Sequence, residues 1–498
     1  MTLSHVHSLM LSRCPLLLLT SLLLPGCSLF GSEERHTPAV SGSRVASPVA
    51  RETVPVIWVE DALPPVHGLQ QERPFRDVVV EGEDFWRLYV VEGGGDPEII
   101  TESRRLLSSP VWADDGVSLL IATASRLEGR VPNSFLNGYA KYARGDAHPI
   151  WDEAFEPSVS AKPAPNARLL LVTDRRGLGG RASAVYLKEP LGKSWRLEGL
   201  PGDSIRGDAW SPDGAYSVIS VRHEHELGLP ARSFYVVQPS GDHALFVGVQ
   251  DYGITPRWSP DGGRLAFASG HDLVVLDIAS GHRQTVPIGL YIAAAPRWNE
   301  TGALIAFENG VIDAVSGRVL IQPGETHVTD SAISPDGRWF AFSLEPRPPV
   351  GASCVLPPLA NVTLLRDLDG PAHQARPLLS CEDGFYTYVN WVASDRLMVR
   401  GPSCWGCESY TSRLALVSVP EGGVQPLTEG LEPAASYAVS PEDGRLLVGG
   451  SKLRVYAANG SPLRVIEAPR GFAVTAVAWS PDGSRFAYVV GPARLDIL

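Results

Sequence analysis

A five-residue phrase, Trp-Ser-Pro-Asp-Gly, recurs along this chain of 498 residues and constrains its fold more than any other feature. A turn that repeats between apolar segments indicates an architecture made of one repeated unit. The clear copies are Trp210-Ser211-Pro212-Asp213-Gly214, Trp258-Ser259-Pro260-Asp261-Gly262, Ile333-Ser334-Pro335-Asp336-Gly337 and Trp479-Ser480-Pro481-Asp482-Gly483. Degenerate copies begin at Trp112, Trp298, Trp391 and Val439, and the weakest is Ala164-Pro165-Asn166-Ala167.

Each residue type in the phrase has a conformational role. Proline presets φ for the first central position of a turn, aspartate can accept hydrogen bonds from nearby amides, and glycine adopts the left-handed conformation that closes the hairpin. The tryptophan should lie on an innermost strand and pack between neighbouring repeats. Because a group needed once for chemistry has no reason to recur in every turn, we interpret these aspartates as structural rather than catalytic or calcium-binding.

The spacing of the copies predicts an all-β propeller. The period runs from about 35 to about 58 residues, and each copy is followed by apolar or alternating segments of strand length, such as 264–267 and 273–278. Four antiparallel strands per repeat make one blade. We predict eight blades, because the copy at Asn166 is weak, with seven or nine as alternatives. Amino-terminal strands within 76–103 should complete the final blade and so remove an open edge.

The phrase resembles the repeat of TolB-type propellers, also called WD40-like or PD40 repeats, which occur in TolB and in prolyl-oligopeptidase-type peptidases. The resemblance covers roughly residues 105–498 and implies a β-propeller. The stretch between Cys27 and Trp112 is too poor in helical pattern for us to expect the amino-terminal α/β domain of TolB there. The G-x-S-x-G nucleophile elbow of a peptidase partner domain is not found, so we do not expect an enzyme.

The first residues have the pattern of an export signal. A basic start and an apolar run from Pro15 to Leu24 lead into Leu24-Pro25-Gly26-Cys27, which resembles the lipobox of bacterial lipoproteins. The alternative is an ordinary secretory signal with an incidental cysteine. We predict a signal peptide over 1–26, lipid on Cys27, a flexible tether over 27–55 and one propeller domain over 56–498, in which 56–104 close the ring. Ser28 resembles the outer-membrane sorting pattern, so we predict a protein that is lipid-anchored in the bacterial cell envelope, at the outer membrane and facing the periplasm or the exterior.

Charge and composition restrict the partners. The formal net charge is -12, and no stripe of lysine and arginine marks a phosphate-binding surface, so a nucleic-acid partner is not expected. The residues suggest no cofactor.

Long loops that join second and third strands should share one face of the ring. They span 125–137, 174–183, 223–233, 344–360 and 401–412, and because loops carry function more often than strands, this face is a candidate binding surface, with tolerated surface insertion as the alternative. Cys354, Cys381, Cys404 and Cys407 fall at the same end. In an oxidising compartment we favour disulfides 354–381 and 404–407 over a zinc site. His223 and His225 are weak metal candidates, since a solvated charged loop explains them as well.

Two functions remain open. The first is a lipid-anchored, non-catalytic module that binds a protein or envelope component through the long-loop face. The second is a small-ligand-binding or hydrolase- or lyase-type propeller that uses its central channel. Arg257 and Arg297, each directly before a tryptophan on an innermost strand, could line that channel, although pairing between blades is the structural alternative.

Overall fold

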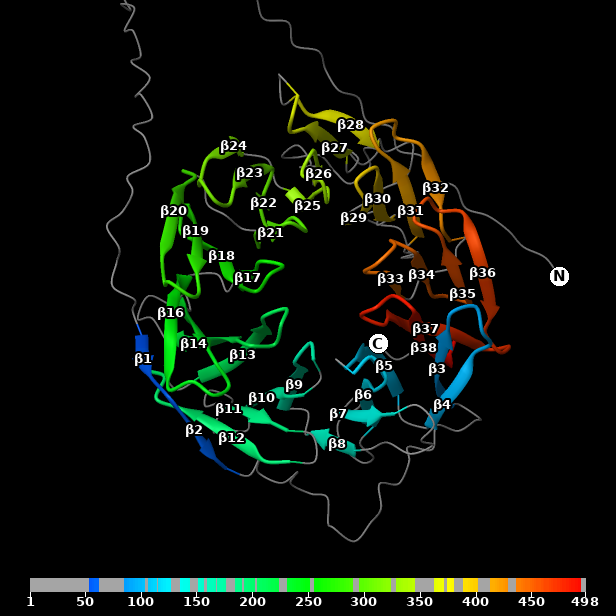
Figure 1. Ribbon diagram of the computed structural model, residues 1–498, viewed down its shortest axis with the longest axis horizontal. Coiled ribbons are helices and arrows are strands. Elements are labelled where there is room, and N and C mark those ends of the chain that lie inside the picture. The colour runs from blue at the N-terminus through cyan, green and yellow to red at the C-terminus, as the bar shows by residue number, and fades with distance from the viewer. Residues whose placement is uncertain are drawn as a thin grey trace, which may run out of the picture. The chain divides into compact units, whose positions relative to one another are not determined.

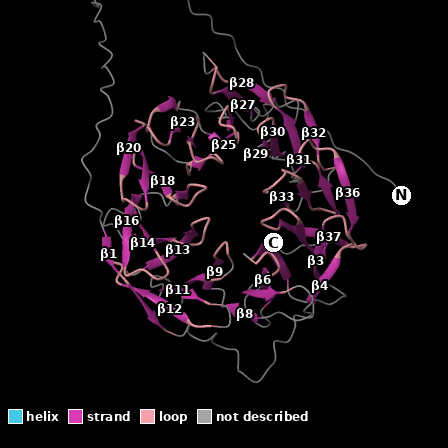
Figure 2. Cartoon of the chain, viewed as in Figure 1, coloured by secondary structure: helices cyan, strands magenta, loops and turns pink. Residues whose placement is uncertain are grey.

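The computed structural model describes residues 53–61 and 85–493, apart from the segments 104–105, 114, 127–134, 144–150, 156–158, 167, 176–183, 190–191, 202–203, 224–230, 251–254, 290–294, 324–327, 345–361, 371–373, 380–387, 402–412 and 429–435. All of these residues belong to one compact unit, Ser47–Leu498. Their regular elements are β-strands throughout (Figure 2). The described part of the chain holds no helix with the length and apolar character needed to cross a membrane.

The strands form nine antiparallel sheets that follow one another around a central opening (Figure 1). We number them as blades 1 to 9 by their innermost strands, which are β5 (Leu106–Trp112), β9 (Val159–Pro163), β13 (Ser204–Trp210), β17 (Arg257–Trp258), β21 (Arg297–Trp298), β25 (Val328–Ile333), β29 (Tyr388–Ala393), β33 (Tyr437–Val439) and β37 (Phe472–Trp479). The second strands are β6 (Leu119–Arg126), β10 (Leu170–Asp174), β14 (Ser217–His223), β18 (Arg264–Ser269), β22 (Leu304–Phe307), β26 (Trp339–Leu344), β30 (Arg396–Gly401), β34 (Leu446–Val448) and β38 (Arg485–Pro492).

The outer half of each blade is a second hairpin. The third strands are β7 (Phe135–Tyr142), β11 (Ala184–Lys188), β15 (Ala231–Val237), β19 (Asp272–Asp277), β23 (Gly310–Asp313), β27 (Val362–Asp367), β31 (Arg413–Ser418), β35 (Lys452–Tyr456) and β3 (Trp86–Glu92). The fourth strands are β8 (Trp151–Phe155), β12 (Ser194–Glu198), β16 (His243–Gln250), β20 (Arg283–Pro287), β24 (Val319–Ile321), β28 (Arg376–Leu379), β32 (Val424–Pro426), β36 (Pro462–Glu467) and β4 (Glu98–Ser103).

The prediction of eight blades is wrong, and the alternative count of nine is correct. The difference is the weak copy at Asn166, which does join two strands of a blade, β9 and β10. Its backbone closes as the clear copies do, because the Ala164 amide donates to the Leu169 carbonyl at 2.8 Å. The Asn166 side chain takes the place of aspartate by accepting the Arg168 amide at 3.1 Å. Asparagine can therefore supply the turn chemistry that we assigned to aspartate alone.

The ring closes through strands from both ends of the propeller, as predicted. Blade 9 has the order β37-β38-β3-β4, so amino-terminal strands pair with the last strands of the repeat region. The register joins Tyr89 to Tyr488, whose rings stack with centroids 4.8 Å apart. Six consecutive residue pairs hold β3 against β38, which leaves no open edge between the two ends.

The turn phrase has the geometry expected of a hairpin-closing motif. In the copy at Trp258, the Ser259 hydroxyl donates to the Asp261 carboxylate and accepts the Arg264 amide at 2.9 Å. Asp261 also accepts the Gly263 amide at 3.0 Å, and these hydrogen bonds, first of all the one from Ser259, lower its pKa. Gly262 has a φ of +71°, which requires the freedom of glycine.

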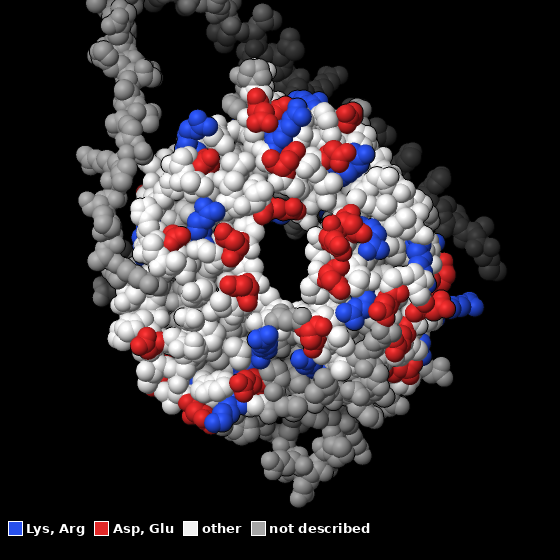
Figure 3. All heavy atoms as spheres, viewed as in Figure 1, with Lys and Arg blue, Asp and Glu red and all other residues white. Residues whose placement is uncertain are grey.

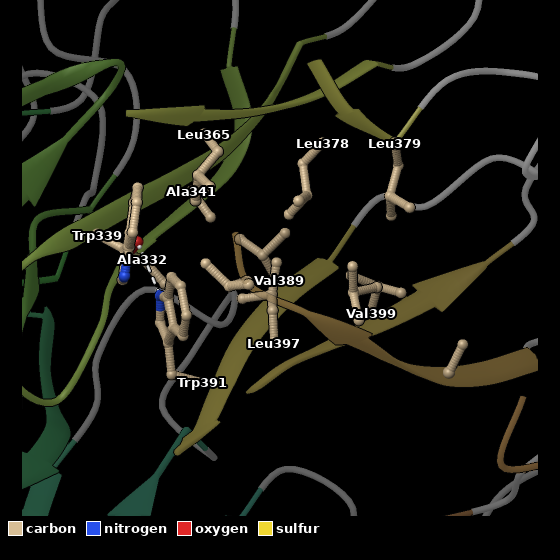
Figure 4. Close-up of a cluster of buried hydrophobic side chains, with 13 residues drawn as sticks. Ala332, Trp339, Ala341, Leu365, Leu378, Leu379, Val389, Trp391, Leu397 and Val399 are labelled. Atoms are coloured by element: carbon tan, nitrogen blue, oxygen red, sulfur yellow. Dashed lines mark hydrogen bonds between the residues drawn. The ribbon is translucent and has the colours of Figure 1, made fainter. Parts of the chain in front are cut away.

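Tryptophans at the inner strands bond one blade to the next, which confirms their predicted place. Trp391 of blade 7 donates its indole N–H to the Ala332 carbonyl of blade 6 at 3.1 Å, and Figure 4 shows this bond as a dashed line at one side of a buried apolar cluster. The other bonds of this kind run from Trp112 to Ala478, from Trp210 to Lys162 and from Trp298 to Arg257. Nine clusters of buried apolar side chains fill the nine junctions between blades. Complete burial of one such side chain contributes roughly 1.5–3 kcal/mol.

Two short strands ahead of the ring add a fifth strand to two neighbouring blades. β1 (Thr53–Pro55) pairs with β16 of blade 3, and β2 (Ile57–Glu60) pairs with β12 of blade 2. Between them Val56 is buried in the cluster that joins these blades. We call residues 53–61 the strap. Part of the segment that we expected to close the ring, and the end of the expected tether, thus lies across blades 2 and 3.

Candidate functional site

The loop-face residues singled out in the sequence fall largely outside the described residues. These are Cys354, Cys381, Cys404, Cys407 and His225, and the lipidation candidate Cys27 also lies outside the described residues. His223 is the last residue of β14. The predicted lipid anchor, disulfides and loop surface therefore remain predictions.

A cavity of about 680 Å³ lies on the channel side of blades 4 to 8. Most of its lining belongs to innermost strands, from Arg257 and Trp258 on blade 4 to Tyr437 on blade 8. Its volume is in the range of small-ligand pockets. Figure 3 shows the central opening of the ring from one face, where Asp and Glu side chains border much of the rim.

An ion pair and a backbone hydrogen bond, both made by Asp330, link three blades inside this cavity. Arg297 of blade 5 donates from Nη1 to the Asp330 carboxylate of blade 6, and its side chain is 38% exposed against 16% for Asp330. Asp330 also accepts the backbone amides of Ser331 and Val389, each at 3.0 Å. Both carboxylate oxygens are therefore occupied, and the pairing between blades considered for Arg297 is confirmed.

Two further arginines line the same cavity. Arg257 is exposed, and its backbone carbonyl accepts the Trp298 indole N–H at 3.0 Å. Arg400, the residue before the end of β30, is half-buried. Asp330 is the one carboxylate among the described lining residues, so its pairing with Arg297 leaves a surplus of positive charge.

Aromatic and apolar surface lies beside these charges. Trp258, Trp298, Val328 and Tyr437 line the cavity and are half-buried, so part of each side chain can contact a ligand. Such a wall with a few polar groups is typical of ligand pockets. The cavity can therefore bind a ligand through its charged arginines and its aromatic side chains together.

On blade 7 the cavity reaches the strand ends that lead into a long loop. Arg400 near the end of β30 and Leu414 near the start of β31 belong to its lining, together with Met398 in the middle of β30. The chain between these strands is the segment 402–412, which carries Cys404 and Cys407. The cavity is therefore adjacent to the end of the ring from which this loop starts.

A second charged group lies on the inner strands of blades 2 and 3. Lys162 donates from Nζ to the Asp208 backbone carbonyl, and Arg206 lies 3.3 Å from the Asp208 carboxylate. The Asp208 side chain is 4% exposed, and its Oδ2 has no hydrogen-bond partner among the described residues. Burial lowers the pKa of Lys162. No group of three or more metal-ligating side chains occurs in the described residues.

Sequence reasoning found some of these residues and missed others. Arg257 and Arg297 were candidates because each precedes a tryptophan. Asp330, Asn390 and Tyr437 were not, since they come from separate blades. Asp330 could have been noticed in the sequence because it is a charged residue on the strand that leads into the turn phrase at Ile333.

Several known proteins are similar to parts of this chain. Residues 460–491 match the WD40 family, described as WD domain, G-beta repeat. The β-propeller domain of the trilobed protease from Pyrococcus furiosus aligns with 10% identity and a TM-score of 0.39, over 74% of this chain and 95% of that one. A putative TolB from Agrobacterium tumefaciens aligns with 16% identity and a TM-score of 0.30, over 82% and 99%. No protein of curated function matches the chain in sequence.

A peptidase propeller is also similar over part of its length. The acylaminoacyl peptidase from Pyrococcus horikoshii aligns with 10% identity and a TM-score of 0.40, over 73% of this chain. This chain spans about half of that peptidase, 52%.

The ring of four-stranded blades defines the protein as a β-propeller. The match of residues 460–491 to a WD40 repeat agrees with the WD40-like resemblance that the recurring turn phrase carries.

Proposed function

We propose that this protein is a non-catalytic binding module of the bacterial cell envelope, anchored by lipid on Cys27, and that its partner or ligand binds in the channel-side cavity. The observation that carries the proposal is the 680 Å³ cavity lined by arginines and half-buried aromatic side chains. Its lining includes Arg400 and Leu414, near the strand ends that flank the segment 402–412, so a protein partner on the predicted loop face could reach into it.

The state of Asp330 supports a binding rather than a catalytic role. Its carboxylate accepts one guanidinium and two backbone amides, so it serves to hold blades 5, 6 and 7 in register. A general base must be within reach of a substrate proton and free to accept it. Among the other polar lining residues, Arg257 and Asn390 are suited to hydrogen bonding and charge recognition.

Site-specific photocrosslinking in intact cells tests the proposal. A photoreactive amino acid replaces Asn390 in the cavity or, as the control, the exposed Thr285 on the outer strand β20. Gel electrophoresis and intact mass then detect protein and small-molecule adducts. We expect adducts from position 390 and none from 285. Equal labelling at both positions, or none at 390, would contradict binding in the cavity.

The anchor is tested separately. Cys27→Ala should move the protein from the membrane fraction to the soluble fraction after cell lysis, because the predicted lipid attachment is lost. Unchanged membrane association of this variant would exclude lipid on Cys27 as the anchor.

A further inference from the structure

We propose that the ligand of the channel-side cavity carries a carboxylate on an aromatic or apolar group, and that Arg257 binds the carboxylate. This inference rests on the proposed binding function and names its ligand chemistry. That chemistry is shared by free organic acids and by the carboxyl-terminal residue of a protein chain.

The charge balance of the cavity is the first argument. Three arginines and one aspartate line it, and that aspartate is bound to Arg297 and to two backbone amides. The surplus charge is positive in a protein whose formal net charge is -12. A cleft that concentrates one sign of charge attracts ligands of the opposite sign.

The innermost strands of the whole ring also carry more basic than acidic side chains. The described innermost strands of the nine blades carry four basic and two acidic side chains. The basic residues are Lys162, Arg206, Arg257 and Arg297, on four successive blades. This arc contrasts with the acidic side chains that border the opening in Figure 3.

Lys162, Arg257 and Arg297 occupy one repeated position. Arg257 and Arg297 each precede the tryptophan of their copy, and Lys162 stands two residues before Ala164, whose amide closes the turn of blade 2 as the Ser259 amide closes that of blade 4. The cations are therefore at one level of the wall. Of the three, Lys162 donates to the Asp208 carbonyl and Arg297 to Asp330, whereas no described contact engages the exposed Arg257 guanidinium.

The chemistry around Arg257 selects a carboxylate on an apolar body. A guanidinium binds a carboxylate through two parallel hydrogen bonds, which gives directional recognition. Trp258, Trp298 and Tyr437 offer aromatic surface in the same cavity, and aromatic groups contribute most when they are taken out of water. A ligand that carries both a carboxylate and an apolar group can therefore contact the Arg257 guanidinium and the aromatic side chains at the same time.

Two matched probe pairs test this inference on the purified propeller, by ligand-observed NMR at millimolar concentration. The first pair is N-acetylphenylalanine and its amide. The second is a five-residue peptide ending in phenylalanine, with a free or an amidated carboxyl terminus. We expect each acid to bind at least about tenfold more tightly than its amide, and Arg257→Ala to remove that preference. Arg318→Ala, which removes an exposed arginine of blade 5 outside the cavity lining, is the control and should leave it intact.

The outcomes separate the inference from the proposed function. Equal binding of acid and amide, unaffected by Arg257→Ala, would overturn carboxylate recognition and leave cavity binding in place. Binding of neither acid would also overturn the inference, while the photocrosslinking at Asn390 decides the proposed function independently. If the acids bind as expected, tighter binding of the peptide identifies a chain terminus as the source, and equal affinity identifies a free organic acid.

Discussion

The guanidinium of Arg264 on blade 4 lies 5.0 Å from the centroid of the Trp298 ring on blade 5. The same side chain donates from Nη2 to the Gly302 carbonyl of the blade 5 turn at 2.7 Å. Blades 8 and 9 repeat the arrangement, with Arg445 4.8 Å from the Trp479 ring and 2.9 Å from the Gly483 carbonyl. In both cases an arginine one or two residues after the turn phrase of one blade therefore binds the turn phrase of the next blade.

Arg264→Ala should destabilise the junction between blades 4 and 5. It removes a charge-assisted hydrogen bond and a cation–π contact, so we expect a loss of about 1–2 kcal/mol in the free energy of unfolding. Urea denaturation followed by tryptophan fluorescence measures the change. Arg338→Ala is the matched control, because Arg338 lies over the ring of the adjacent Trp339 and pairs with Asp367 of its own blade. An equal effect of the two variants would refute the interblade role.

The indole hydrogen bonds between blades give a second prediction. Trp391→Phe should lower the free energy of unfolding by about 1 kcal/mol more than Trp258→Phe. Trp391 loses its bond to the Ala332 carbonyl, whereas the buried Trp258 Nε1 has no hydrogen-bond partner among the described residues. Both changes remove similar apolar volume, so the difference in urea midpoint isolates the bond. Equal midpoints would show that the bond contributes nothing.

The turn aspartates predict a pH dependence. Hydrogen bonds from Ser480 and then Ser484 lower the pKa of Asp482 to about 2, from an ordinary 3.8. A depressed pKa in the folded state stabilises the protein above the ordinary value, and this contribution disappears as the pH falls towards 2. Asp482→Asn should therefore lower the melting temperature at neutral pH, and the difference from the parent protein should shrink between about pH 4 and pH 2.

A double-variant cycle assigns this effect to the turn. The Ser480 hydroxyl donates to Asp482, so Asp482→Asn should cost less in a Ser480→Ala background. Additive effects of the two substitutions, or a difference that persists unchanged at pH 2, would contradict the proposed coupling.

The sequence predicts the local unit of this fold better than the number of units. Turn chemistry and strand patterns are local, so the blades and their closure by β3 and β4 could be predicted. The count was wrong because the copy at Asn166 keeps only the proline of the phrase. The strap was missed for a different reason: strands of three and four residues, Thr53–Pro55 and Ile57–Glu60, carry too little pattern to reveal partners far along the chain.

The candidate site could likewise be predicted only in part from the sequence. Arg257 and Arg297 could be proposed as channel residues because each stands in a recognisable place before a tryptophan. The cavity also needs Asp330, Asn390 and Tyr437, which are separated from them by whole blades. Their proximity follows from the way nine blades close into a ring, which no local pattern encodes.

The strap supplies the last prediction. Gly199 has a φ of +100°, and a Cβ added there would lie 2.6 Å from the Pro55 carbonyl oxygen. Gly199→Ala should therefore push the strap away from blades 2 and 3, whereas Gly471→Ala, with a φ of +86° and no atom within 4 Å of the added Cβ, adds backbone strain alone.

Hydrogen–deuterium exchange read by mass spectrometry distinguishes the two variants. Amides of β1 and β2 should exchange at least about tenfold faster in Gly199→Ala, the effect of losing about 1.4 kcal/mol of local stability, and should be unchanged in Gly471→Ala. The inner strands should keep their protection in both variants, because the strap pairs with outer strands alone. Unchanged exchange of the strap in Gly199→Ala would mean that its pairing with β12 and β16 tolerates the displacement.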